Sequence, residues 1–290
     1  MTGNGAAAPI IGGPAAARGE TNRHYDQDPR VFELFLGSHL KYSAGLYRDG
    51  ASTLDDAQTA KLHFIARRLG LSGGERILDV GCGWGSVACF LASEYGCQVT
   101  GITPAPRQAD YVRARAQQAG IGDRVRTVVT HFQDFTERAE FDGVCFVGSI
   151  VHIPRKREVL AQAARLLRNG GRLYLSETCF RNERIASRFI SSQGVDFLRE
   201  QIFGWGELVP LSAYVGACED AGLSLCAVDD LSADYARTVA QWRLNVQANA
   251  DGLESLQPGS VAQLLRYFDI CNAAWGYTTK QYALTAGRVR

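Results

Sequence analysis

The sequence has no excess of either charge, because 31 lysine and arginine residues face 30 acidic ones. A nearly neutral chain offers no positive field to the phosphates of a nucleic acid, so no nucleic acid partner is expected. No apolar run approaches the ~20 residues that span a bilayer, and no integral membrane contact is expected. The eight cysteines lack C-x-x-C spacing, which predicts reduced thiols in a cytoplasmic protein rather than disulfides or a zinc site.

The start of the chain lacks the basic segment and apolar core of a secretion signal. Residues 1–21 are rich in glycine, alanine and proline and predict a disordered tail. Residues 22–70 predict a helical N-terminal cap, with one helix near 31–36 and an amphipathic helix over 54–70. Residues 71–290 then form one domain without internal repeats.

Short apolar runs alternate with helical segments from residue 76 onward, and this rhythm predicts an α/β fold with a parallel sheet. The stretch 169–171, Asn-Gly-Gly, is interpreted as the stop signal of a helix over 155–167. The stretch 178–210 breaks the rhythm and predicts a lid over a ligand. The expected strands are 77–80, 99–102, 125–129, 144–147, 173–175, 223–228 and 277–284, and the other expected helices are 86–95, 106–119 and 211–221.

A glycine loop follows the first expected strand directly. Gly81, Gly83 and Gly85 let the backbone approach a ligand closely and aim the N–H groups of the next helix at it. Asp79 ends the strand, and burying its carboxylate requires a compensating partner such as a ligand ammonium. This favours the amino-acid end of S-adenosylmethionine (SAM) over a dinucleotide, because no G-x-x-G spacing follows. A plain strand-to-helix turn is the alternative.

The next two strands end in neutral polar groups. Thr103 and, on the following helix, Gln108 are suited to ribose hydroxyls, where a nicotinamide site would place an acid. Gln133 and Asp134 follow the third strand and are placed for an adenine ring and its amine. Each residue alone is better explained as an exposed polar loop residue, and only the ordered set favours SAM.

The sequence resembles the cyclopropane-fatty-acid and mycolic-acid cyclopropane synthases over about residues 22–290. The resemblance implies a seven-stranded, Rossmann-like class I methyltransferase sheet with an antiparallel last strand, and SAM as cofactor. It is carried by segments 24–26, 42–43, 54–62, the glycine loop with Trp84, Thr103 with Gln108, 203–208, and 235–238 with Trp242. The cofactor contacts that it implies are Tyr42, Ser43, Gly81, Gly83, Trp84, Thr103, Gln108, Gln133 and Asp134.

The same family is thought to hold a bicarbonate ion for ring closure with a Cys, a Glu-His pair, a second His and a Tyr. The corresponding residues here are Ala44, Val151 with His152, Ser176 and Tyr235. Losing the thiol, the carboxylate and one imidazole removes most of the polar groups that could hold an anion or relay its proton. The sequence therefore favours methylation without a ring.

Three residues are candidates for catalysis. His152 and Glu177 follow strand ends on the ligand-binding side of such a sheet, although a helix-capping histidine and a solvated loop acid are the alternatives. Tyr235 is a candidate through the resemblance alone. Aromatic faces could stabilise a carbocation, and the residues expected to wall the substrate pocket are Tyr25, Phe203, Trp205 and Trp242, with Tyr42, Tyr235 and Trp275 as further candidates.

The sequence thus predicts a cytoplasmic SAM-dependent methyltransferase that needs no metal and acts on a small or lipid-like acceptor. Methylation at carbon in specialised metabolism is favoured. A true cyclopropane synthase, an N- or O-methyltransferase and a SAM-binding protein without turnover are the alternatives. A homo-oligomer is left open.

Overall fold

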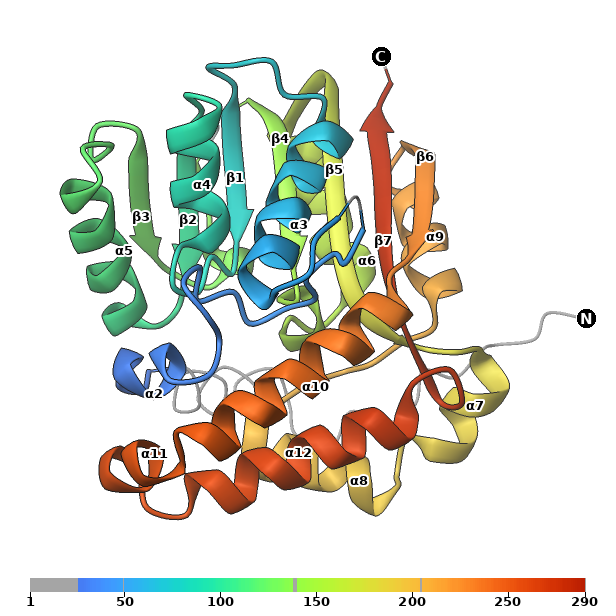
Figure 1. The fold of residues 1–290 in the computed structure, drawn as a ribbon. Helices are drawn as coiled ribbons and strands as arrows, with labels where there is room; N and C mark the ends of the chain where they lie inside the picture. Colours follow the sequence, from blue (N-terminus) through green and yellow to red (C-terminus); the bar gives the residue numbers. More distant parts are fainter. Residues whose placement is uncertain (1–25, 49, 138–139, 204, 290) are drawn as a thin grey trace, which may run out of the picture.

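The computed structural model describes residues 26–48, 50–137, 140–203 and 205–289. Its seven-stranded sheet has the order β3-β2-β1-β4-β5-β7-β6 (Figure 1). Strands β1 to β5 pair in parallel, and β7 is antiparallel to β5 and β6. This confirms the predicted α/β class and the antiparallel last strand. The strands are β1 (Arg76–Val80), β2 (Gln98–Thr103), β3 (Val125–Val129), β4 (Phe141–Val147), β5 (Leu167–Phe180), β6 (Leu223–Asp230) and β7 (Thr279–Arg288).

Helices cover both faces of this sheet because the strands are apolar on both sides. On β1, Ile77 packs into one apolar cluster with α3, α4 and α5, and its neighbour Leu78 packs into a second with α6 and α9. Among the described residues, no helix is long and apolar enough to cross a membrane. The helices that cover the two faces of the sheet are α3 (Leu54–Leu69), α4 (Ser86–Glu94), α5 (Pro106–Gln118), α6 (Lys156–Leu166) and α9 (Leu211–Asp220).

A further layer of helices lies along the sheet edge where the parallel strands end (Figure 1). Its apolar cluster joins Phe35, Trp242 and Phe268 from widely separated parts of the chain. The sequence patterns did not predict the helices between 232 and 274. The layer contains α2 (Pro29–Glu33), α7 (Glu183–Phe189), α8 (Gln193–Phe197), the π-helical turn η3 (Leu198–Phe203), α10 (Ser232–Ala248), α11 (Ala250–Leu256) and α12 (Ser260–Ala274).

Helix α3 is fixed by its own sequence at both ends. Thr53 and Asp56 form a reciprocal capping box, and Gly70 ends the helix in the left-handed region at φ 72°. Leu62 and Ile65 pack in the same cluster as β1. The expected segment 22–70 therefore contributes α3 to the sheet's covering layer, whereas α2 packs with α10 and α12. The tail 1–21 lies outside the described residues.

The segment 169–171 does not cap a helix, and that prediction is wrong. Helix α6 ends at Leu166 and β5 begins at Leu167, so the two glycines lie inside the strand. Gly170 has φ 79°, and the pairing of β4 with β5 shifts register beside it. A left-handed residue within a strand accommodates such an irregularity, so the glycines serve the sheet rather than the helix.

Candidate functional site

A cavity of about 320 Å³ opens where β1, β2, β4 and β5 end and the helical layer begins. This is the switch point of the strand order, because β2 and β4 lie on opposite sides of β1 in the sheet. Residues from β1, the glycine loop and β2 line one half of the cavity, and residues from β5, α8, α10 and α12 line the other. We call the first the polar half and the second the apolar half, whose walls are mainly aliphatic and aromatic but also include Glu177 and Thr178.

The glycine loop forms the floor of the polar half. Gly81, Gly83 and Gly85 all have positive φ, and Gly85 is the N-cap of α4. A Cβ added at Gly81 would lie 2.4 Å from the Cβ of Ser149, whereas one at Gly83 would meet no heavy atom within 4 Å. Gly81 is thus required by packing within the protein, and Gly83 borders the open space of the cavity.

Asp79 lies at the end of β1 beside this loop and is 2% exposed. Burial raises the pKa of its carboxyl to about 6, and the charge of Lys41 opposes that rise. Its Oδ2 atom is buried without a hydrogen-bond partner among the described residues. An ammonium group in the cavity would satisfy that oxygen, as the sequence predicts.

The predicted ribose and adenine contacts are only partly brought together. The hydroxyl of Thr103 donates to Oε1 of Gln108 at 2.7 Å, and both residues line the cavity. Gln133 also lines it, from the short turn η1 (Phe132–Asp134). Asp134 is exposed and does not line the cavity. The turn presents Gln133 to the cavity, and the role of Asp134 as a cofactor contact stays a prediction.

The segment between α2 and α3, together with Trp84 of the glycine loop, completes the lining of the polar half. Tyr42, Ser43 and Trp84 line the cavity as predicted. The Trp84 ring packs 5.3 Å from that of Phe32, and Tyr42 stands edge-on to the Phe32 ring at 5.9 Å. These aromatic contacts attach the loop that carries Ser43 to the helical layer.

His152 ends the short turn η2 (Ile150–His152) after β4 and lines the cavity. Its Nδ1 lies 2.8 Å from the carbonyl oxygen of Trp205. A carbonyl can only accept, so Nδ1 carries a proton, and in the neutral form of the ring Nε2 is the basic nitrogen. His152 is therefore held in the tautomer that can take a proton through Nε2.

Glu177 lies near the end of β5 and lines the cavity, with 4% of its surface exposed. Burial raises the pKa of its carboxyl to about 7, although N–H bonds from Thr178 (2.8 Å) and Val151 (3.2 Å) lower it. Thr178 donates its hydroxyl to Gln281 of β7 at 2.8 Å, which fixes this part of the strand. Glu177 is not a solvated loop acid, and its pKa lies near neutrality.

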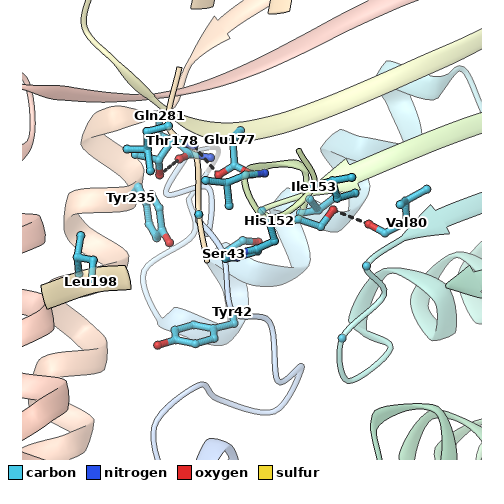
Figure 2. Close-up of a pocket in the computed structure, with 18 of the residues that line it drawn as sticks. Tyr42, Ser43, Val80, His152, Ile153, Glu177, Thr178, Leu198, Tyr235 and Gln281 are labelled. Atoms are coloured by element: carbon cyan, nitrogen blue, oxygen red, sulfur yellow. Dashed lines mark hydrogen bonds between the residues drawn. The ribbon is translucent and has the colours of Figure 1, made fainter. Parts of the chain in front are cut away.

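Tyr235 on α10 lines the same cavity, and its ring packs 4.9 Å from that of Trp275. Figure 2 shows Tyr235, Glu177 and His152 around one space, with Ser43 and Tyr42 on the neighbouring loop. The three residues predicted for catalysis are thus brought together from α10, β5 and η2. Their catalytic roles stay a prediction.

The residues predicted as aromatic walls of the substrate pocket are not brought together at the cavity. Trp242 is fully buried in the helical layer, where it packs against Tyr42 and Tyr235 and does not line the cavity. Trp205 is also outside the lining, and its ring lies under the ammonium of Lys156 at 5.5 Å. The Trp242 ring thus packs against two residues that line the cavity, and Trp205 contacts His152 through its backbone carbonyl. Tyr25 and the side chain of Phe203 lie outside the described residues.

Two lysines are buried at or beside the site, and no sequence signal marks either of them, because lysine is usually exposed. Lys41 is 2% exposed, lines the cavity and donates to Ser43 Oγ at 2.6 Å. Lys156 donates to the carbonyls of Ile150 and Ile153, both at 2.8 Å, and pairs with Glu207 at 3.3 Å. It thereby holds the turn that carries His152.

Comparison with known proteins agrees with this geometry. The family model described as mycolic acid cyclopropane synthetase matches residues 15–283. A probable fatty acid methyltransferase of Pseudomonas putida is 30% identical over 252 residues, covering 84% of this chain and 62% of the relative. Sphingolipid C9-methyltransferase 1 of Gibberella zeae is 31% identical over 242 residues, covering 81% of this chain and 47% of the relative. The chain thus spans about half to three-fifths of the length of these relatives.

The mycolic acid cyclopropane synthase CmaA1, solved with SAH and CTAB, superimposes with a TM-score of 0.86 at 25% identity. The match covers 93% of this chain and 98% of that one. The predicted resemblance and the class I methyltransferase fold are confirmed. On the family match and this shared fold, the chain belongs to the mycolic acid cyclopropane synthetase family, whose members are SAM-dependent methyltransferases and cyclopropane synthases.

Proposed function

We propose that this protein transfers the methyl group of SAM to an alkene carbon of an apolar, lipid-like acceptor, and that Glu177 removes the proton that must leave. The observation that carries the proposal is a buried carboxyl with a pKa near 7 in a chamber whose walls are mainly apolar, next to the polar half of the cavity. Such a group can exchange a proton at neutral pH.

The polar half fits SAM. When bound, SAM supplies an electrophilic methyl group on a sulfonium. In this proposal Asp79 binds its ammonium, the loop N–H groups after Gly81 contribute to binding its carboxylate, and Thr103 with Gln108 bind its ribose. The fit rests on the unpartnered Oδ2 of Asp79 and the open space at Gly83.

The apolar half fits an uncharged hydrocarbon. The described lining contains no arginine, and its one lysine, Lys41, lies beside Asp79 at the polar end. An anionic headgroup would therefore find no cation in the chamber and would stay outside it. The chamber walls include Phe180, Phe189, Val195, Leu198, Ile270 and Trp275.

The chemistry balances without a further reagent. The alkene π electrons form the new bond to the methyl carbon while the bond from that carbon to sulfur breaks and S-adenosylhomocysteine leaves. A carbocation remains on the neighbouring alkene carbon. The faces of Tyr235 and Trp275 stabilise that charge. Glu177 then takes a proton from an adjacent carbon, and the C–H electron pair restores a double bond. His152 is held in a tautomer that can receive the proton in turn.

Ring closure is the second candidate, because the family match includes cyclopropane synthases. In that outcome the base removes a proton from the transferred methyl group instead of from the acceptor. The two products are isomers of equal mass, so ordinary mass measurement does not separate them. The protein should be incubated with CD₃-labelled SAM and a panel of unsaturated fatty acids, phospholipids and isoprenoid alcohols.

Retention of three deuterium atoms in the product, with a double bond still cleaved by ozone, supports methylation. Retention of two deuterium atoms in an ozone-resistant product supports the ring and contradicts the favoured route. Label on nitrogen or oxygen would contradict both.

We also propose a cytoplasmic location, supported by eight cysteines that are all free thiols.

A further inference from the structure

Lys41 is held in the cavity by an unusual local backbone. The residue before it, Leu40, has φ 51°, a left-handed conformation that is unfavourable for a residue with a Cβ. The fully buried Gln58 anchors both sides of this turn by donating to the carbonyls of Leu36 (2.7 Å) and Lys41 (3.4 Å). The fold therefore maintains a strained turn that carries a lysine into the interior.

The ammonium of Lys41 lies among polar groups of the cofactor half. It donates to Ser43 Oγ at 2.6 Å and interacts electrostatically with Asp79. Burial lowers the pKa of Lys41 to about 8, and the charge of Asp79 counteracts that effect. The lysine thus remains mostly charged at pH 7, opposite a carboxylate whose Oδ2 has no partner among the described residues.

One positive and one negative side chain, both 2% exposed, line the same wall next to the glycine loop. This arrangement is complementary to a zwitterion that presents its own ammonium and carboxylate. A ligand with only one of these charges would leave the other buried side chain without a counter-charge, which is unfavourable in a desolvated site.

We propose that Lys41 binds the carboxylate of the amino-acid end of SAM, opposite Asp79, which binds its ammonium, so that the pair selects ligands carrying a complete α-amino acid. The inference rests on the proposed function, because it concerns the same cofactor. It adds a binding residue and a specificity that neither the resemblance nor the relatives assign.

A simpler role for Lys41 predicts a different pattern among ligands. If Lys41 only sets the charge of Asp79, its removal would change the binding of every ligand that carries the ammonium, with or without a carboxylate. If Lys41 binds the ligand carboxylate, its removal weakens only the ligand that carries a carboxylate. The comparison of S-adenosylhomocysteine with an amine that lacks the carboxylate therefore separates the two roles.

The experiment measures three ligands by calorimetry on the full chain and on Lys41→Met and Asp79→Asn. S-adenosylhomocysteine has both charges, S-adenosyl-3-thiopropylamine lacks the carboxylate, and 5′-methylthioadenosine lacks both. Lys41→Met should weaken S-adenosylhomocysteine about 10- to 100-fold, as for loss of a charge-assisted hydrogen bond, without weakening the other two. Asp79→Asn should weaken both amine-bearing ligands and spare 5′-methylthioadenosine.

Unchanged 5′-methylthioadenosine binding shows that each variant keeps a folded pocket. Unchanged or tighter S-adenosylhomocysteine binding in Lys41→Met, or equal loss for all three ligands, overturns the assignment of Lys41 and leaves the proposed function standing. Failure of the unsubstituted chain to bind S-adenosylhomocysteine overturns the proposed function and this inference with it.

Discussion

Replacing Glu177 by glutamine should remove both a base and a source of pH-dependent instability. A carboxyl whose pKa rises from 4.5 in the unfolded chain to about 7 in the fold costs the folded state about 3 kcal/mol when it ionises. Because the folded pKa is raised, the free energy of unfolding of the unsubstituted protein is unreduced below pH 4.5 and falls as the pH rises to about 7. Glutamine cannot ionise, so Glu177→Gln should become more stable relative to the parent by about 3 kcal/mol across that window.

The rate should change in the opposite direction. A base works only when ionised, so kcat/KM of the parent should rise with pH and level off above about 7. Glu177→Gln should lower kcat by about 10²- to 10⁴-fold, the usual contribution of general base catalysis, and abolish this rise. The variant is thus expected to gain stability at neutral pH while losing activity.

Urea unfolding from pH 4.5 to 8 and initial rates over the same range test both effects. Glu94→Gln, at an exposed site on α4, is the matched control and should change neither. A stability difference between parent and Glu177→Gln that does not vary with pH would refute the burial argument. Activity of the variant within threefold of the parent would refute the role as base.

Three other substitutions test neighbouring parts of the site. His152→Ala should slow turnover by about 10²-fold without weakening S-adenosylhomocysteine binding, and an unchanged rate would make His152 structural. Gly81→Ala should lower the melting temperature because its Cβ collides with Ser149, whereas Gly83→Ala should mainly weaken S-adenosylhomocysteine binding; equal melting temperatures would contradict this difference. Tyr235→Phe should retain most of the rate and Tyr235→Leu should lose it, if the ring face stabilises a cation, and equal rates for the two would contradict that role.

The sheet and the cofactor loop could be predicted because their signals are local. Apolar runs of strand length, the glycines after Asp79 and the capping residues of α3 each act within a few positions of the chain. The Asn-Gly-Gly segment misled the prediction because a left-handed glycine ends a helix and accommodates a strand irregularity equally well.

The aromatic walls and the buried lysines could not be predicted because they depend on tertiary packing. Trp242 fits the apolar spacing of a helix whether its ring faces the cavity or the protein interior. Its contacts with Tyr42 and with Phe268 of α12 place the ring in the interior, and these contacts depend on the tertiary structure. Lysine is usually a surface residue, so nothing in the sequence marks Lys41 or Lys156 as buried. Their burial follows from the turn at Leu40 and from the carbonyls of η2, which the sequence does not reveal.

The most direct measurement of the central claim is a crystal structure of the protein with S-adenosylhomocysteine. We expect the amino-acid end to lie between Asp79 and the glycine loop and the ribose to lie near Thr103 and Gln108. We expect the sulfur to face the chamber of Glu177. A ligand bound outside this cavity, or one whose sulfur points away from Glu177, would contradict this expectation.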